Sequence, residues 1–133
     1  MAYAKKPRVF ILGISGLIGN ELAWRMREKY DVTGAYFHHP VQIPDVQAYP
    51  ISNPAQATSI LETMVRVLNP DFCIMACGIN DRKMCAEQVK IAEGVNIYLP
   101  LSLAIAANKI KAKNINLSCS DIFGGYAGDY NEK

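Results

Sequence analysis

The sequence carries little net charge and has no closely spaced pair of cysteines. Both features restrict the classes of protein to which it can belong. A formal net charge of +2 with scattered Lys and Arg gives no argument for binding nucleic acid. No two cysteines have C-x-x-C spacing, which disfavours a disulfide framework or a zinc site. The four cysteines lie in apolar or strand-like segments and predict reduced, buried thiols in a cytoplasmic protein: Cys73, Cys77, Cys85 and Cys119.

The sequence also lacks a long apolar run. No stretch approaches the roughly 20 apolar residues of a membrane span, and the run from Ile97 to Ala107 is short and contains Pro100. The basic start, Lys5 to Arg8, precedes apolar residues as in a signal peptide, but the glycine turn and the helix that follow favour a first β-strand. We therefore expect no membrane partner.

Length and composition fit one globular domain. The chain has 133 residues, of which 50% are hydrophobic and 20% charged, so a disordered or fibrous class is excluded and one compact core is expected. Repeats and low-complexity tracts are absent. We predict a single domain over residues 1–133.

A glycine-rich junction dominates the N-terminal part. The apolar run Val9 to Leu12 leads directly into Gly13, Gly16 and Gly19, and an amphipathic helix follows. In such a junction glycine permits the tight turn, a close approach to a pyrophosphate, and contact between helix and strand. The helix N-terminus then offers free N–H groups and its positive dipole end. The alternative is an ordinary turn between a strand and a helix.

Further along the chain, strand and helix patterns alternate. This order predicts a doubly wound parallel sheet in three layers, with helices on both faces and right-handed crossovers. Ligands bind such a sheet at the carboxyl ends of its strands, where the glycine junction lies. The predicted strands are Val9–Leu12, Val32–Phe37, a short Val46–Ile51, the doubly buried Phe72–Ala76, and Asn114–Ser118; the helices end near Lys29, Asn69 and Lys111. Asn53, Pro54 and Gln56 predict a cap for the second helix, whose apolar stripe includes Ala57, Leu61 and Val65. Pro100 is expected to kink the last helical region.

Several segments together resemble the N-terminal half of the dTDP-4-dehydrorhamnose reductases, in the extended branch of the short-chain dehydrogenase/reductase group. The resemblance implies a Rossmann-type fold truncated after about the fifth strand. It covers nearly the whole chain and rests on the G-x-x-G-x-x-G turn, Ser52-Asn53-Pro54, Asn69-Pro70-Asp71, Ala76-Cys77-Gly78, Ala86-Glu87, Val95-Asn96, Ser118 to Gly125, and Tyr130-Asn131-Glu132.

The resemblance also implies which residues hold a dinucleotide. Ile51 is expected to pack on the adenine, although Pro50 stands where relatives often have Asp. Asn96 is expected to orient backbone or water behind the site, with a helix-surface residue as the alternative, and Cys77 is better explained as a small core residue. The remaining cofactor contacts implied are the turn residues Gly13, Ser15, Gly16, Leu17, Ile18 and Gly19, the end of the second strand with His38 and His39, and Ala76 and Gly78.

Residue types at the second strand favour NADP(H) over NAD(H). An NAD site usually places Asp or Glu there for the ribose hydroxyls, and the sequence has neither between Asp31 and Asp45. His38 and His39 instead suit a 2′-phosphate. The alternative is that both are solvent-exposed loop residues; a metal site is disfavoured because no third ligand is suggested nearby.

The catalytic groups of the family are incompletely matched. Its reaction transfers hydride from nicotinamide to a 4-keto nucleotide sugar in dTDP-rhamnose biosynthesis, with a Tyr donating the proton, a Lys four residues later, and a Ser or Thr polarising the carbonyl. Cys119 takes the Ser/Thr position, and a thiol is the weaker donor. None of the seven tyrosines has Lys four residues later.

Three hypotheses follow. The chain is the cofactor-binding part of a sugar-nucleotide reductase whose substrate-binding half lies beyond it; or a non-catalytic NAD(P)-binding regulatory or interaction module; or a structural domain that binds nothing. A nucleotide-sugar partner is expected only with the missing half. If Asn114–Ser118 is the last strand, its free edge predicts a homo-oligomer or another partner at that edge.

Overall fold

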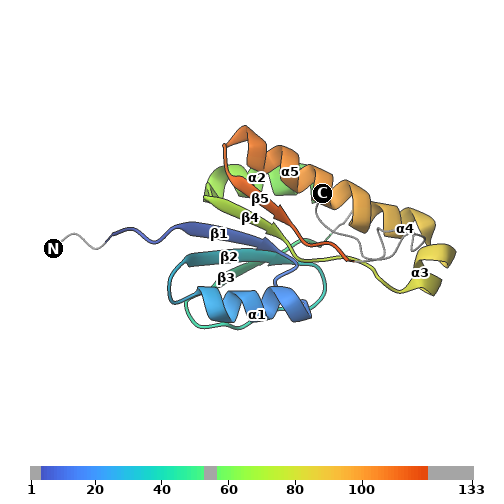
Figure 1. The fold of residues 1–133 in the computed structure, drawn as a ribbon, viewed down its shortest axis with the longest axis horizontal. Helices are drawn as coiled ribbons and strands as arrows, with labels where there is room; N and C mark the ends of the chain where they lie inside the picture. Colours follow the sequence, from blue (N-terminus) through green and yellow to red (C-terminus); the bar gives the residue numbers. More distant parts are fainter. Residues whose placement is uncertain (1–3, 53–56, 120–133) are drawn as a thin grey trace, which may run out of the picture.

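The computed structural model describes residues 4–52 and 57–119 and shows five parallel strands with flanking helices (Figure 1). The predicted cap at Asn53, Pro54 and Gln56 and the motif residues after Cys119 lie outside the described residues. In chain order the elements are β1 (Arg8–Leu12), α1 (Leu17–Met26), β2 (Asp31–Tyr36), β3 (Gln47–Pro50), α2 (Ala57–Leu68), β4 (Phe72–Met75), α3 (Arg82–Glu87), α4 (Val89–Glu93), η2 (Gly94–Tyr98), α5 (Leu99–Lys109) and β5 (Lys113–Asn116).

The sheet has the order β3-β2-β1-β4-β5. The central strand β1 pairs in parallel with β2 and with β4, so that Val9 lies beside both Val32 and Phe72. Strands β2 and β3 follow one another outward on one side of β1, and β4 and β5 do so on the other side. The switch point of the topology therefore lies between β1 and β4. The predicted Rossmann-type, doubly wound parallel sheet is confirmed.

Helices cover both faces of the sheet. Figure 1 shows α1 on one face and α2 with α5 on the other. Alternate residues of β1 point to the two layers, because Val9 and Ile11 pack in the cluster with Ala23 of α1, whereas Phe10 and Leu12 pack in the cluster with α2 and α5. The continuous apolar runs of β1 and β4 are thereby explained: both strands are buried on two sides.

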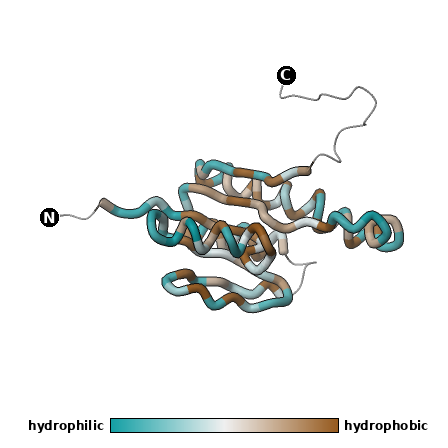
Figure 2. The backbone as a smooth tube through the Cα atoms, turned by 60° about the horizontal axis from the view of Figure 1, so that its bottom comes forward, coloured by the Kyte–Doolittle hydropathy of each residue, from teal (hydrophilic) through white to brown (hydrophobic). Residues whose placement is uncertain are grey.

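Helix α2 packs against α5. Ala57, Leu61 and Val65 are its buried residues, as the apolar stripe predicted. At the surface the Lys109 ammonium lies 2.7 Å from a Glu62 carboxylate oxygen, and this hydrogen bond lowers the pKa of Glu62. Along the helices apolar and polar residues alternate, which is visible as brown and teal segments in Figure 2.

Some element bounds differ from the prediction. Helix α1 ends at Met26 rather than near Lys29, because the Lys29 N–H donates to the carbonyl of Met26 in a tighter i to i+3 turn. Strand β5 begins at Lys113 and ends at Asn116, so Ser118 lies beyond it. The irregularity expected near Pro100 takes the form of the π-helical segment η2, which directly precedes α5.

One helical stretch, Val89–Lys109, is long and apolar enough to cross a membrane by length and composition. The sequence predicts no such span, because the apolar run Ile97 to Ala107 is short and contains Pro100; the structure joins α4, η2 and α5 into one longer helical stretch. Its buried residues Leu99, Leu103 and Ala107 pack with α2 in the core. The expectation of no membrane partner stays a prediction.

The four cysteines are all free. Cys73 is buried, Cys77 and Cys85 are half-buried, and Cys119 is exposed. The predicted burial is therefore wrong for Cys119, because β5 stops at Asn116 and leaves the following residues outside the sheet. Within residues 4–52 and 57–119, no three His, Cys, Asp or Glu side chains form a group that could hold a metal ion.

Candidate cofactor site

The glycine junction forms a tight turn at the carboxyl end of β1. Gly13 has φ of +89°, and a Cβ there would lie 2.7 Å from the Cβ of Cys77. A Cβ on Gly19 would overlap the carbonyl oxygen of Gly13. Gly13 is required because of its positive φ and because the loop after β4 lies against it. Gly19 is required because α1 starts directly against the turn.

The start of α1 has no side-chain cap. Its N-cap is Gly16, no side chain accepts a hydrogen bond from the first turn, and no acidic residue lies in that turn. The N–H groups of Leu17 and Ile18 therefore have no intrahelical acceptor. Together with the positive end of the helix dipole, they form an anion-binding position.

A hollow of about 680 Å³ opens at this end of the sheet. Its walls are formed by the glycine turn, the loops after β2 and β4, the helical stretch around Asn96, and the end of β5 with the residues that follow it. Leu17, 91% exposed, leaves an apolar surface at its rim. The predicted site residues that line it are Gly13, Ser15, Gly16, Leu17, Ile18, His38, His39, Ala76, Cys77, Gly78, Asn96 and Cys119.

Asn96 fixes the loop after β4. Its Oδ1 accepts a hydrogen bond from the N–H of Ile79 at 2.8 Å, and its Nδ2 donates to the carbonyl of the same residue at 2.8 Å. The Cys85 thiol adds a donor to that carbonyl at 3.5 Å. Asn96 does orient backbone behind the hollow, as predicted; its contact with a cofactor stays a prediction.

The histidines follow β2 on the rim of the hollow. His38 and His39 are exposed, and their rings lie 6.4 Å apart. Phe37, just before them, lines the hollow as well. The two imidazoles thus occupy the end of β2 where the ribose of a dinucleotide is expected, and no carboxylate lines the hollow in the described part of the chain.

The two thiols of the hollow differ. Burial raises the pKa of Cys77 from 9.0 to about 11, so its thiol is neutral at physiological pH. It is a small neutral wall residue and not a thiolate nucleophile. Cys119, in contrast, is exposed on the segment after β5, at the mouth of the hollow.

Two predicted contact residues do not line the hollow. Gly19 is buried behind the turn, and Ile51 is 1% exposed within the core cluster of α2 and α5. Sequence reasoning missed other residues that do line it. Asn80, in the loop after β4, and Asn116, the last residue of β5, are polar side chains at the carboxyl ends of these strands, and that placement was the available signal; Ile79, Pro100 and Leu117 carried none.

The hollow lacks the remaining groups of the family reaction. No Tyr and no Lys is among its described lining residues. Ser15 and Ser118 supply its hydroxyl groups, Cys77 and Cys119 its thiols, and His38 and His39 its titratable nitrogens. The described surface offers backbone donors suited to an anion, but it presents no Tyr-Lys pair to protonate a reduced carbonyl.

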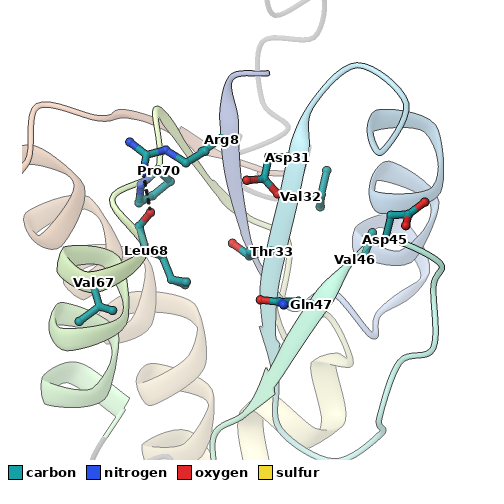
Figure 3. Close-up of a pocket in the computed structure, with 10 residues that line it drawn as sticks. All are labelled: Arg8, Asp31, Val32, Thr33, Asp45, Val46, Gln47, Val67, Leu68 and Pro70. Atoms are coloured by element: carbon teal, nitrogen blue, oxygen red, sulfur yellow. Dashed lines mark hydrogen bonds between the residues drawn. The ribbon is translucent and has the colours of Figure 1, made fainter. Parts of the chain in front are cut away.

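A second hollow, of about 620 Å³, lies at the opposite end of the strands (Figure 3). It is lined by charged side chains, among them Arg8, Asp31 and Asp45. Arg8 extends over Pro70 and donates to the Leu68 carbonyl at the end of α2, at 3.4 Å. One of its charged side chains, Arg8, thus lies at the negative end of a helix.

No protein-family model matches the sequence, and no curated protein sequence matches it either. Solved structures do match. A hypothetical dTDP-4-dehydrorhamnose reductase from Sulfolobus tokodaii has a TM-score of 0.81 and 25% identity, over 95% of this chain and 44% of its own. The dTDP-4-dehydrorhamnose reductase of Bacillus anthracis, in complex with NADP, has a TM-score of 0.64 and 21% identity, over 85% and 36%.

The enzyme WbmH of Bordetella bronchiseptica, in complex with NAD+, has a TM-score of 0.67 and 20% identity, over 80% of this chain and 36% of its own. The chain thus spans less than half the length of these solved proteins. Their likeness covers the sheet and the helices that position the hollow. The resemblance to the N-terminal part of dTDP-4-dehydrorhamnose reductases is confirmed.

Proposed function

We propose that this chain binds a nicotinamide dinucleotide as the cofactor-binding part of a sugar-nucleotide reductase. The observation that carries the proposal is the uncapped start of α1 at Gly16, which follows the tight turn of Gly13 and opens on the 680 Å³ hollow. The pyrophosphate would lie against the N–H groups of this first turn. Two of the structural neighbours were solved in complex with NAD+ and with NADP, which supports a dinucleotide as the ligand.

Small side chains extend this surface toward the nicotinamide. Ala76 and Gly78 line the hollow where β4 ends, beside the turn of β1. Their size permits a ring to approach the backbone, and Asn96 holds the adjoining Ile79 in place. Hydride transfer to a 4-keto nucleotide sugar would then occur at the open side of the hollow, near Cys119, in a reduced, cytoplasmic setting.

A paired substitution tests cofactor binding. Ser15→Asp places a carboxylate beside the expected pyrophosphate, and we expect it to weaken NADPH binding at least about tenfold, about 1.4 kcal/mol, by charge repulsion. Gln47→Glu adds the same charge at the opposite end of the sheet, where Gln47 lines the second hollow. Titration of NADPH fluorescence should separate the two variants; equal affinities, or no saturable binding to the unsubstituted chain, would contradict the proposal.

The cofactor preference is a finer part of the proposal. Since no carboxylate lines the hollow in the described residues and two imidazoles end β2, NADPH is expected to bind more tightly than NADH. Replacing His38 and His39 together by Ala should reduce that preference while NADH affinity changes little. A chain that binds NADH as tightly as NADPH before the substitution would rule this preference out.

A second function is favoured by one observation. Because the described hollow contains neither Tyr nor Lys, the chain as given would bind NADPH without oxidising it, as a regulatory or interaction module does. Mixing the chain, NADPH and a 4-keto nucleotide sugar, and following absorbance of the reduced nicotinamide, tests the module. Turnover by this chain alone would contradict it and require another proton donor. Binding without turnover is expected both of the module and of a cofactor-binding part that lacks its Tyr-Lys pair; turnover that appears only when a segment supplying that pair is added would favour the reductase.

A further inference from the structure

The carboxyl-end hollow has two adjacent imidazoles and no Lys, Arg, Asp or Glu among its described lining residues. The imidazoles belong to His38 and His39, on the loop that follows β2. Lys and Arg side chains stay protonated across the physiological range, whereas imidazole is the side chain that gains or loses its charge between pH 5 and 8. A full positive charge on the described surface of this hollow therefore depends on pH.

Backbone hydrogen bonds fix the end of β2 beside the glycine turn. The N–H groups of Gly13 and Ile14 both donate to the Ala35 carbonyl, at 2.9 and 3.2 Å. From the other side, the Ile51 N–H donates to the Tyr36 carbonyl at 2.8 Å. The histidines follow directly after this anchored segment, next to the start of α1. In the sheet order, β1 and β4 separate them from β5.

The two imidazole rings lie close enough to bind one anion together. Their centroids are 6.4 Å apart, with an angle of 66° between the ring planes. A hydrogen bond from a charged N–H to an anionic oxygen is about 2.7–2.9 Å long. Both rings can therefore donate to oxygens of a single phosphate group placed between them. His38 and His39 are exposed, so they exchange protons freely with solvent.

The ionisable groups on the neighbouring elements do not neutralise the pair. The Cys77 thiol lines the same hollow and is neutral, because burial raises its pKa to about 11; Cys119 lines the hollow at its mouth. On α1 the Glu21 carboxylate is paired with Arg25 at 2.6 Å. In the loop between β2 and β3, Asp45 lines the amino-end hollow instead. On β3 the Tyr49 hydroxyl donates to the Gln47 side chain.

We propose that His38 and His39, when protonated, bind the 2′-phosphate of NADP(H), so that the choice between NADP(H) and NAD(H) varies with pH. The inference rests on the proposed function, because it describes the regulation of the same cofactor site. NAD(H) carries a hydroxyl in place of this phosphate and shares every other group, including the pyrophosphate. Protonation of the pair should therefore change the affinity for one dinucleotide and leave the other nearly unchanged.

The pH dependence has a defined sign. As the pH falls from about 8 to about 6, imidazoles gain positive charge. A phosphate monoester keeps at least one negative charge over this range, since its second pKa is about 6. The attraction therefore grows toward pH 6 and levels off below it. We expect the ratio of NADP+ to NAD+ affinity to rise about tenfold, near the lower end of what a hydrogen bond to a charged group contributes.

Isothermal titration calorimetry of the full 133-residue chain with NADP+ and with NAD+ tests the inference, over about pH 6 to about pH 8. The affinity ratio is the first readout. The second is proton uptake, measured from the dependence of the binding heat on the ionisation enthalpy of the buffer. Near neutral pH, NADP+ should take up more protons than NAD+, because only NADP+ favours the charged imidazoles.

Two double variants separate charge from structure. His38→Arg with His39→Arg keeps the positive charge at every pH, so it should retain the NADP+ preference and lose its pH dependence. His38→Gln with His39→Gln should lose both and bind NAD+ as before. The matched control is Gln47→His, which adds an imidazole to the amino-end hollow and should change neither readout.

The outcomes distinguish this inference from the proposed function. An affinity ratio that is the same at about pH 6 and about pH 8 would overturn the inference and leave cofactor binding intact. A pH-dependent ratio that persists in the double Gln variant, with unchanged circular dichroism, would assign the effect to other groups and overturn it as well. If neither NADP+ nor NAD+ binds at any pH, the proposed function fails together with the inference.

Discussion

The two ends of the sheet carry hollows of similar size, about 680 and about 620 Å³, with different chemistry. Among the described residues that line the carboxyl-end hollow there is no Asp, Glu, Lys or Arg, and the titratable side-chain nitrogens are those of the two histidines. The start of α1 supplies N–H groups without an intrahelical acceptor. At the amino end Arg8 and the carboxylates of Asp31 and Asp45 line the wall.

The comparison shows that volume does not identify the ligand site. An anionic dinucleotide at the amino end would meet two carboxylates and the negative end of α2. Among the described residues, Arg8 is the one cation that lines that hollow. Its guanidinium already donates to the Leu68 carbonyl, and its backbone N–H donates to an Asp71 carboxylate oxygen at 2.7 Å. At the amino end the Arg8 side chain already binds a backbone carbonyl, whereas at the carboxyl end the first-turn N–H groups of α1 have no intrahelical acceptor.

The largest expected effect of a single substitution comes from filling the turn. Gly19→Ala places a Cβ against the Gly13 carbonyl, and we expect a loss of about 3 kcal/mol in the free energy of unfolding. Gly94→Ala is the control, since a Cβ there meets nothing within 4 Å; it should stabilise by about 0.5–1 kcal/mol. Urea unfolding measures both. Equal effects would show that the close approach is not required.

A smaller effect is expected from the loop that walls the same hollow. Asn96→Ala removes both hydrogen bonds to Ile79 and should cost about 1–2 kcal/mol in stability. NADPH affinity should also fall several-fold, because the loop after β4 loses its anchor. Asn108→Ala, at an exposed position near the end of α5, is the control. An Asn96→Ala variant with unchanged stability and affinity would contradict the role.

The thiols behind the carboxyl end predict a pH dependence. Burial raises the pKa of Cys73 and Cys77 from 9.0 to about 11. Between these values the unfolded chain releases protons that the folded chain retains, so stability is full below pH 9.0 and falls as the pH rises toward 11. Two pKa units correspond to about 2.7 kcal/mol for each thiol once the pH exceeds 11, so the two together should lose up to about 5 kcal/mol.

Urea unfolding at several pH values checks this dependence. The Cys73→Ala, Cys77→Ala double variant should have a flatter profile across that range than the unsubstituted chain. Single variants should lie between the two. A double variant with the original slope would assign the alkaline loss of stability to other groups.

The smallest effect is expected at the amino end. Arg8→Gln removes a 3.4 Å hydrogen bond to the end of α2 and should cost about 0.5 kcal/mol. It should leave NADPH affinity unchanged, measured by the same fluorescence titration. A marked loss of affinity would place the cofactor at the amino end and reverse the comparison.

Sequence patterns predicted the framework well because local physics dictates it. The runs that became β1 and β4 are apolar throughout since both faces are covered, and Asn69-Pro70 ends α2. Glycine spacing located the turn, and Gly13 has the positive φ that spacing implied. Asn96 could be placed near the hollow only from the resemblance to the reductase family. Helical periodicity alone assigns no role to an exposed asparagine.

Other features depend on tertiary placement. Cys119 looked like a strand residue, but β5 stops before it and leaves it exposed. Asn80 and Asn116 belong to different strand ends, and only the β4–β5 pairing brings both to one hollow. Ile51 looked like an adenine contact, and its burial in the core follows from packing against α2 and α5, which periodicity does not reveal.

The most direct test of cofactor binding at the carboxyl end is amide chemical-shift mapping by nuclear magnetic resonance during a titration with NADPH. The account predicts the largest shifts at the N–H groups of Ser15, Gly16, Leu17 and Ile18, with further shifts at Gly78 and Ile79. The amide signals of Arg8 and Gln47, at the amino end, should not shift. Shifts concentrated at the amino end, or none at saturating NADPH, would contradict it.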